Sequence, residues 1–254
     1  MGHGFKLEKT GFTMWDKLEN QVADEFESLD SDKSQFMKKQ FAKRVYTGEI
    51  SFVWKEVLQD PWLEEVYDED TRQGRGFYDQ TTKMMKGRHY TQTTLRSVLY
   101  LREMEKYFDL NKIKWITDFG PGYGGFIRVW HKLFTNTRYQ LVDLPRLHQV
   151  SQHYLNQYDI SAEWNTLENH QSPKDLSLFV ATHSLNECTI ETRNEVEKIL
   201  PEYDHIYIVY NDSFDGINNL EYFEELGGQL HNTHTVHLYF DKKATHKWRL
   251  IAIK

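Results

Sequence analysis

The chain has 254 residues, of which 39% are hydrophobic and 15% aromatic, and its formal net charge is −7. This apolar content is sufficient for a packed core and excludes an intrinsically disordered chain. The acidic balance argues against a constitutive nucleic-acid binder, because neutralising phosphates requires a basic surface. We therefore expect a globular protein with one α/β domain and an additional segment, and a small or weakly charged substrate.

The sequence also suggests where the protein resides. Cys188 is the single cysteine, so no intrachain disulfide forms and nothing indicates an oxidising compartment. Residues 1–19 contain no apolar run followed by a small-residue cleavage site. No stretch approaches the ~18 apolar residues of a membrane span. We expect a cytoplasmic protein without a membrane partner, and we leave a homo-oligomer open.

Residues 1–110 are predicted to form a helical N-terminal region that acts as a substrate lid or in oligomerisation. Apolar spacing and capping residues predict helices over 13–29, over 36–45, from Ser51, from Asp60-Pro61 and over 91–108. Residues 68–90 lack a clear period and are interpreted as a loop. This loop is either a solvated connection or a lid whose cations meet a phosphorylated or acidic substrate. Those cations are Arg72, Arg75, Lys83, Lys86, Arg88 and His89.

Residues 111–254 alternate short β-branched runs with helical segments, which is typical of βαβ units around a parallel sheet. Strands are predicted over 114–119, 139–143, 162–165, 176–182 and 205–210. Helices are predicted from Gly124, Pro145 and Glu191 and over 218–226. Two further strands, 233–240 and 247–253, form an antiparallel hairpin. The predicted fold is a Rossmann-like α/β sheet with a C-terminal antiparallel hairpin, preceded by the helical N-terminal region.

The first of these strands leads into G-P-G-Y-G-G and then into a helix. Gly120, Gly122 and Gly124 allow a sharp turn and a close approach of the backbone to a ligand. Asp118, at the end of the strand, is placed to orient this loop or to meet a cationic amine. An acid followed by three alternating glycines suits S-adenosylmethionine, whose methionine part is zwitterionic and whose sulfonium is positive.

The same segment also matches the dinucleotide pattern G-x-G-x-x-G through Gly120, Gly122 and Gly125, so the glycines alone do not choose the cofactor. Asp143 ends the next strand, where its carboxylate can accept hydrogen bonds from the ribose of either nucleoside cofactor. A dehydrogenase ordinarily needs a further substrate domain, whereas here five alternating strands are followed by a terminal hairpin. An NAD(P)-dependent oxidoreductase and a non-catalytic Rossmann-like binding module remain the alternatives.

Three motifs within residues 91–212 occur in a fixed order: I-T-D-F-G-P-G-Y-G-G-F, Y-Q-L-V-D-L-P-R-L-H-Q-V-S-Q-H-Y-L and L-F-V-A-T-H-S-L-N-E. Together they resemble the sugar O-methyltransferase family of class I S-adenosylmethionine-dependent methyltransferases. The resemblance implies methyl transfer to a sugar hydroxyl, whether free, nucleotide-linked or in a glycan. It implies cofactor contacts for Asp118, Gly120, Gly122, Tyr123 and Asp143, and places His183, Ser184 and Glu187 near the acceptor.

Methyl transfer to a hydroxyl requires a group that removes a proton. His183 follows the fourth strand and is the first choice, because the ordinary pKa of histidine is near neutral. The alternative is a histidine that hydrogen-bonds its own loop. Glu187 can orient His183, act as the base itself, or begin a helix.

Other ligand contacts are expected at the carboxyl ends of the strands. Asn211 and Asp212 either bind substrate hydroxyls or form an Asx turn. Trp164 and Asn165 are expected at adenine, although Trp164 also suits the core. The remaining expected contacts are Gly124, Leu144 and Thr182 for the cofactor, and Arg88, His89 and Tyr90 for the substrate. No metal is expected, because His231, His234 and His237 would all have to converge on it.

Overall fold

A computed structural model describes residues 14–28, 57, 59–72, 82–85, 88–241 and 247–254. The helices expected over 36–45 and from Ser51 lie outside these residues, as do Arg75 and Lys86 of the expected lid. In the described part of the chain, no helix combines the length and apolar character needed to cross a membrane.

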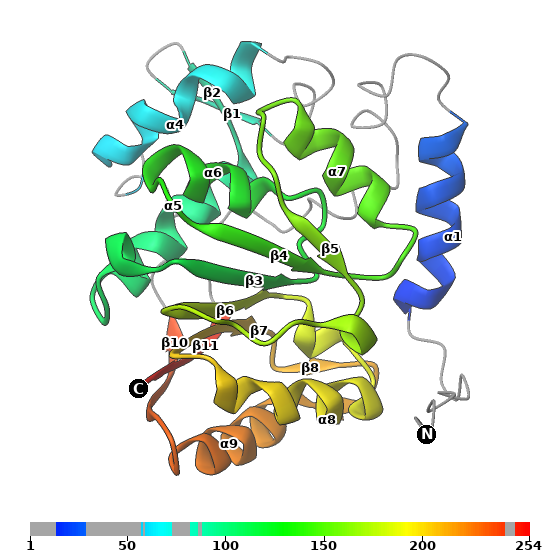
Figure 1. Cartoon of the computed structure of the whole chain (residues 1–254), viewed down its shortest axis with the longest axis vertical. Helices are drawn as coiled ribbons and strands as arrows, with labels where there is room; N and C mark the ends of the chain where they lie inside the picture. The colour runs from blue at the N-terminus through cyan, green and yellow to red at the C-terminus, as the bar shows by residue number, and fades with distance from the viewer. Residues whose placement is uncertain (1–13, 29–56, 58, 73–81, 86–87, 242–246) are drawn as a thin grey trace.

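A seven-stranded mixed sheet forms the centre of the molecule (Figure 1). Its spatial order is β10 (Thr235–Asp241), β11 (Lys247–Ile253), β7 (His205–Tyr210), β6 (Ser177–Thr182), β3 (Trp115–Phe119), β4 (Arg138–Val142) and β5 (Glu163–Asn165). The five strands from β7 to β5 pair in parallel, and β11 runs antiparallel to both of its neighbours. The Rossmann-like sheet with a C-terminal hairpin is confirmed, and the predicted strand ends agree with the observed ends to within two residues.

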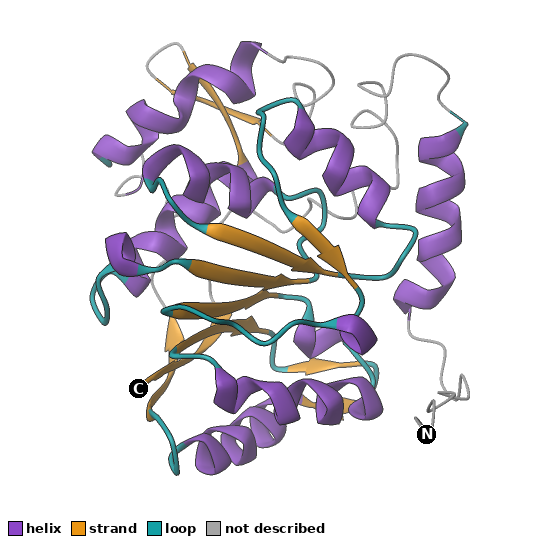
Figure 2. Ribbon diagram, in the orientation of Figure 1, coloured by secondary structure: helices purple, strands orange, loops and turns teal. Residues whose placement is uncertain are grey.

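Helices cover both faces of the sheet (Figure 2). The helices α5 (Gln92–Met104), α6 (Gly125–Leu133) and α7 (His148–Asn156) lie on one face, and α8 (Ile190–Ile199) and α9 (Asn219–Leu230) lie on the other. Alternate strand residues therefore enter different cores: Val180 of β6 packs with the first group and Phe179 with the second. Because both faces are buried, the parallel strands appear in the sequence as nearly continuous apolar runs.

The N-terminal region packs on the face that carries α5 and α6. The helix α4 (Pro61–Arg72) contacts both of them. Arg102 of α5 donates to the two carboxylate oxygens of Asp60 at 2.7 and 2.9 Å, which fixes the start of α4. Leu63 of α4 and Ile116 of β3 belong to one hydrophobic cluster. Residues on both sides of position 110 thus share a core, and the boundary at 110 stays a prediction.

The stretch over residues 68–90 contains regular structure. The helix α4 continues to Arg72, and β1 (Thr82–Met85) pairs antiparallel with β2 (Arg88–Thr91). Tyr90, at the inner end of β2, is 3% exposed and lies in the main hydrophobic cluster. The prediction of a continuous loop is therefore wrong, because tertiary packing rather than local sequence period orders this hairpin.

The other helices match the predicted ones with shifted ends. The helix expected from Pro145 begins at His148, because residues 144–147 form a turn in which Leu147 N donates to Leu144 O. The helix expected over 91–108 ends at Met104. Near the sheet lie α1 (Met14–Glu27), β8 (Ser213–Phe214), β9 (Ile217–Asn218) and the 3-10 turns Leu110–Lys112, Leu167–Asn169, Leu185–Glu187 and Leu200–Glu202.

Candidate active site

The carboxyl ends of the parallel strands gather chemically active side chains at one edge of the sheet. These side chains are Asp118 of β3, Asp143 after β4, His183 after β6 and Asn211 after β7. Backbone hydrogen bonds hold neighbouring ends together: Gly120 N donates to Val142 O at 2.8 Å, and His183 N donates to Val209 O at 2.9 Å. Open α/β sheets bind ligands at this edge.

Asp118 is the most deeply buried acid of this edge. Asp118 is only 2% exposed, and its Oδ2 has no hydrogen-bond partner within the described residues. Burial, together with the neighbouring Asp143 carboxylate, raises the pKa of Asp118 to about 8. An ionised carboxylate in this position is costly unless a cation or a donor reaches it. The site therefore favours a positively charged ligand group next to Asp118.

Asp143 lies close enough to Asp118 for the two carboxylates to interact electrostatically. Adjacent positions in the β3–β4 register, Phe119 beside Val142, explain this proximity. Oδ1 of Asp143 accepts a hydrogen bond from Leu144 N at 2.8 Å. Burial raises the pKa of Asp143 to about 7. The hydrogen bond from Leu144 lowers this pKa, and the negative charge of Glu19 raises it. The structure thus brings together the two acids that the sequence singled out.

The glycine loop between β3 and α6 has a left-handed backbone. The φ angles of Gly120, Gly122 and Gly124 are +66°, +59° and +90°, a region that side chains disfavour. A Cβ on Gly120 would lie 2.3 Å from the Cβ of Ser184, and one on Gly124 would lie 2.9 Å from Leu155 Cγ. Two of these glycines are thus required by packing within the protein, which adds to the ligand approach expected from the sequence.

Tyr123, between these glycines, is buried in the core. It is 3% exposed, and its ring meets the Tyr154 ring edge to face with centroids 4.6 Å apart. A cofactor contact at this position would therefore involve the backbone of Tyr123 rather than its ring.

Trp164 and Asn165 end β5 and are held by protein partners. Trp164 Nε1 donates to Ser151 Oγ at 3.2 Å, and Asn165 Nδ2 donates to Gln140 Oε1 at 2.8 Å. These bonds give both side chains a structural role, and their contact with adenine stays a prediction. The same holds for Leu144, which is partly buried against the main core, and for Thr182, the last residue of β6.

His183 occupies a strained position immediately after β6. Its φ is +66°, which is uncommon for a residue with a side chain and is frequent at functional sites. Nε2 lies 3.4 Å from the Tyr100 hydroxyl. Burial holds the pKa of His183 well below its usual range, and the charges of Arg96, Lys247 and Arg249 lower it further. The imidazole is therefore neutral at pH 7 and has a lone pair that can accept a proton.

A buried ion pair fixes the helix that supplies Tyr100. Arg249 of β11 is 0% exposed, and its Nε donates to Glu103 of α5 at 2.7 Å. Tyr207 of β7 donates to the same carboxylate. Positions 96, 100 and 103 lie on one face of α5. The Arg249–Glu103 pair therefore orients Tyr100 and Arg96 towards the His183 end of the sheet.

Arg96, Tyr100 and Lys247 were not found from the sequence. The spacing of positions 96, 100 and 103 predicts that these residues share one face of a helix. It does not predict which other element of the fold that face packs against.

The residues after β6 and β7 have different surroundings. Ser184 Oγ donates to Phe119 O, so this hydroxyl ties its segment to the end of β3, just before the glycine loop. Asp212 Oδ1 accepts from Trp248 Nε1 at 2.7 Å. Asn211 Oδ1 is buried and has no hydrogen-bond partner within the described residues. Of these residues, Asn211 has a free acceptor atom for a substrate hydroxyl.

The remaining predicted site residues are placed as follows. Glu187 ends the 3-10 turn Leu185–Glu187, and its charge acts on Lys247. Tyr90 is buried in the main hydrophobic cluster, and its contact with a substrate stays a prediction. Arg88 and His89 lie in β2, and their side chains fall outside the described part.

The three histidines considered for a metal have separate surroundings. His231 is the C-cap of α9, His234 Nε2 lies 2.9 Å from Tyr203 O, and the His237 ring packs 4.9 Å from the Tyr107 ring. No group of three His, Cys, Asp or Glu side chains suited to a metal ion occurs in the described part of the chain.

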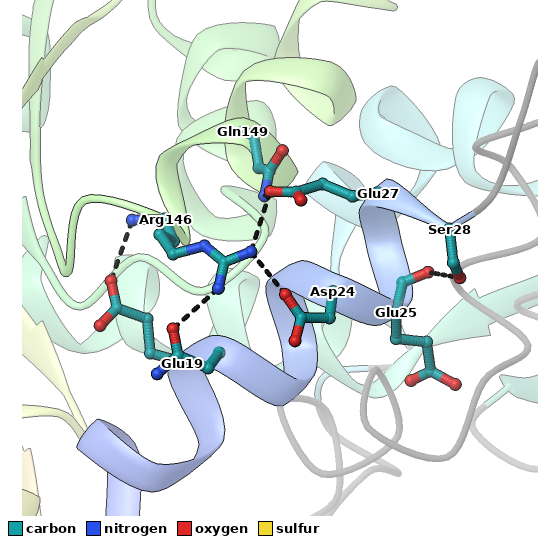
Figure 3. Close-up of polar contacts among 8 residues, drawn as sticks. Glu19, Asp24, Glu25, Glu27, Ser28, Arg146 and Gln149 are labelled. Atoms are coloured by element: carbon teal, nitrogen blue, oxygen red, sulfur yellow. Dashed lines mark hydrogen bonds and ion pairs between the residues drawn. The ribbon is translucent and has the colours of Figure 1, made fainter.

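The N-terminal helix α1 borders the acidic end of the site, beside α7 (Figure 1). Arg146, just before α7, holds α1 through several contacts (Figure 3). Its side chain donates to Asn20 at 2.7 Å and to Asp24 at 2.6 Å, and its backbone N donates to Glu19 at 3.0 Å. Because the charge of Glu19 acts on Asp143, this cluster positions an N-terminal acid next to the candidate cofactor site.

No protein-family model and no curated protein matches the sequence. Among solved structures, the chain is similar to the methyltransferase domain of bacterial CtHen1, with 10% identity and a TM-score of 0.49 over 63% of this chain and 97% of that chain. The chain is also similar to mitomycin 7-O-methyltransferase MmcR, with 12% identity and a TM-score of 0.47 over 95% of this chain and 68% of that chain. A SAM-dependent methyltransferase from Aquifex aeolicus is similar with 13% identity and a TM-score of 0.43 over 80% of this chain and 98% of that chain. Likenesses this distant do not assign a function.

Proposed function

We propose that this chain is an S-adenosylmethionine-dependent O-methyltransferase that acts on a sugar hydroxyl. The observation that carries the proposal is the buried Asp118, whose Oδ2 lacks a partner within the described residues, beside Asp143 at the glycine loop. The cofactor's ammonium group would supply both a donor and a compensating positive charge to Asp118. Its ribose hydroxyls would donate to Asp143.

Asp118 disfavours a dinucleotide. A pyrophosphate at the glycine loop would bring negative charge next to Asp118, whose pKa is already raised by burial and by the Asp143 charge. Like charges brought together in a partly buried site are costly. The charge of this site therefore supports a cationic cofactor over NAD(P), a distinction that the glycine pattern did not make.

S-adenosylmethionine supplies a methyl group that its sulfonium has already activated. The protein must then align the acceptor hydroxyl and remove its proton. In the tautomer in which His183 Nε2–H donates to the Tyr100 oxygen, 3.4 Å away, Nδ1 is unprotonated. Nδ1 accepts the hydroxyl proton as the new C–O bond forms, and Asn211 Oδ1 receives a hydrogen bond from a second hydroxyl of the sugar.

Isothermal titration calorimetry with S-adenosylhomocysteine and, separately, NADH tests the cofactor. We expect saturable binding of S-adenosylhomocysteine at micromolar concentration. Saturable NADH binding without S-adenosylhomocysteine binding would make the protein an oxidoreductase. Absence of binding for both at millimolar concentration would indicate a non-catalytic module.

A mass-spectrometric screen with methyl-labelled cofactor tests the acceptor. Nucleotide sugars, free sugars and glycans are offered as acceptors, and we expect label on a sugar oxygen. Transfer of the label to non-sugar acceptors alone would overturn the sugar assignment while leaving the methyltransferase assignment in place.

A further inference from the structure

Two cations near His183 form no ion pair with any carboxylate in the part of the chain that the structure describes. Among the described residues, Arg96 and Lys247 make no hydrogen bond or ion pair through their side chains. Both residues are half-buried. The third cation that acts on His183, Arg249, is paired with Glu103 at 2.7 Å and with Asp241 at 3.4 Å. Of the three described cations whose charges act on His183, Arg96 and Lys247 are thus the two available to a ligand.

The fold brings these two cations to the acceptor side of the site from different elements. Lys247 is the first residue of β11, and the next residue, Trp248, pairs with Tyr210 at the end of β7. Lys247 therefore lies beside the segment that begins with Asn211. Arg96 precedes Tyr100 by one turn of α5, and the Tyr100 hydroxyl lies 3.4 Å from His183 Nε2.

The surrounding charges compensate these cations only in part. Glu187 and Asp212 favour the charged form of Lys247, whereas Arg96 and Arg249 oppose it. Burial together with the Arg96 and Arg249 charges lowers the pKa of Lys247. Asp212 is exposed and already accepts a hydrogen bond from Trp248. Holding two half-buried cations together without a shared anion is unfavourable, and such arrangements cluster at functional sites.

We propose that Arg96 and Lys247 bind an oxyanion of the acceptor, a carboxylate or a phosphate, next to the hydroxyl that His183 deprotonates. This inference rests on the proposed function and makes the acceptor an acidic or phosphorylated sugar. A guanidinium and an ammonium group both form charge-assisted hydrogen bonds to oxyanions.

An anion bound there also tunes the base. The charges of Arg96 and Lys247 help to hold the pKa of His183 down. A bound anion offsets those charges, so the pKa of His183 rises towards the working pH, where a general base is most effective. A neutral sugar would leave the pKa of His183 low, so an anionic acceptor would react faster than a neutral one.

Inorganic sulfate tests the site without cofactor or acceptor. The pKa of His183 is followed by NMR in the full chain, with the signal assigned through His183→Asn, in sodium sulfate and in sodium chloride of equal ionic strength. We expect sulfate at millimolar concentration to raise this pKa by about 0.5 or more, and chloride to change it less. Arg96→Gln and Lys247→Gln should abolish the difference.

A matched control is Lys114→Gln, at an exposed position just before β3 and thus at the opposite edge of the sheet. This variant should respond to sulfate as the unmodified protein does. Equal responses to sulfate and chloride, or an unchanged sulfate response in Arg96→Gln, would overturn the inference.

Acceptor selectivity separates the two sources of the oxyanion. With labelled S-adenosylmethionine, kcat/KM is compared for glucuronate, glucose 6-phosphate and glucose. We expect at least one anionic sugar to exceed glucose by about 10-fold or more, and Lys247→Gln to remove that preference. Glucuronate as the better acceptor indicates a carboxylate, and glucose 6-phosphate a phosphate.

The two proposals fail in distinguishable ways. Equal transfer to glucose and to both anionic sugars would refute the anion site and retain the methyltransferase. A sulfate effect without any binding of S-adenosylhomocysteine would retain the anion site and refute the methyltransferase.

Discussion

The two halves of the candidate active site differ in charge. At the ends of β3 and β4, Asp118 and Asp143 lie together with Glu19 nearby, and burial raises the pKa of both aspartates. At the ends of β6, β7 and β11, cations surround His183 and lower its pKa. One sheet edge therefore offers a place for a positive ligand beside a place for a negative one. This division matches a sulfonium cofactor and an anionic acceptor.

Removal of the acid in the first half should have the largest effect. In the proposed cofactor site, Asp118→Asn cannot neutralise the ligand's ammonium group, so we expect the affinity for S-adenosylhomocysteine to fall by about 100-fold or more. Calorimetry measures this change. Asp159→Asn is the control, because Asp159 is exposed and its φ of 55° is one that asparagine tolerates. Unchanged affinity in Asp118→Asn would remove the acidic half from cofactor binding.

Loss of His183, the proposed base in the second half, should affect the reaction rather than cofactor binding. His183→Asn retains a residue that tolerates a φ of +66°. We expect kcat to fall by about 100-fold or more while the affinity for S-adenosylhomocysteine stays the same. The exposed His231→Asn serves as control. A rate within a few-fold of the unmodified protein would transfer the role to Glu187 or to no base.

The acidic half should also destabilise the free protein as pH rises. Because the pKa of Asp118 is raised in the folded state, the folded protein keeps a proton that the unfolded chain has released. The associated stability is fully present below the unfolded pKa of 3.8 and is lost as pH rises through about 8. Between pH 5 and pH 8 we expect the free energy of unfolding to fall by about 1–3 kcal/mol.

Urea unfolding of the cofactor-free protein measures this dependence. Asp118→Asn should make it shallower and should be more stable than the unmodified protein at pH 8. If Asp118→Asn were less stable than the unmodified protein at pH 8, the ionised Asp118 carboxylate would already be stabilised by protein groups without a ligand.

The contact between α1 and the acidic half should have the smallest effect. The ion pairs of Arg146 with Asp24 and Glu27 are exposed to solvent, and such pairs contribute little. Arg146→Gln should therefore weaken S-adenosylhomocysteine binding by only about 2–5-fold in calorimetry. A loss comparable to that of Asp118→Asn would place α1 in the cofactor site itself.

The acidic half was predictable from the sequence because its parts are contiguous. A strand, a glycine loop and the next strand end are local patterns, and parallel pairing alone brings Asp118 and Asp143 together. The basic half depends on the position of α5 and on β11, which the last part of the chain inserts beside β7. Lys247 is far in sequence from Arg96 and Tyr100 of α5, and the Arg249–Glu103 pair that orients α5 has no local signature.

Local patterns also failed for individual side chains. Tyr123 lies in the glycine motif, yet its ring packs against Tyr154 in the core. Ser184 follows the candidate base, yet its hydroxyl donates to Phe119 O at the end of β3. A motif specifies the backbone path, whereas the direction of each side chain depends on neighbours that are distant in sequence.

The most direct test of the charge division is the titration of the Asp118 carboxyl by carbon-13 NMR, with and without S-adenosylhomocysteine. In the free protein we expect a pKa of about 8. Binding should lower it by about 1–3, because a positive group within ~4–6 Å favours the ionised carboxylate. A carboxyl that titrates near its usual value in the free protein, or whose pKa does not change when S-adenosylhomocysteine binds, would contradict the account.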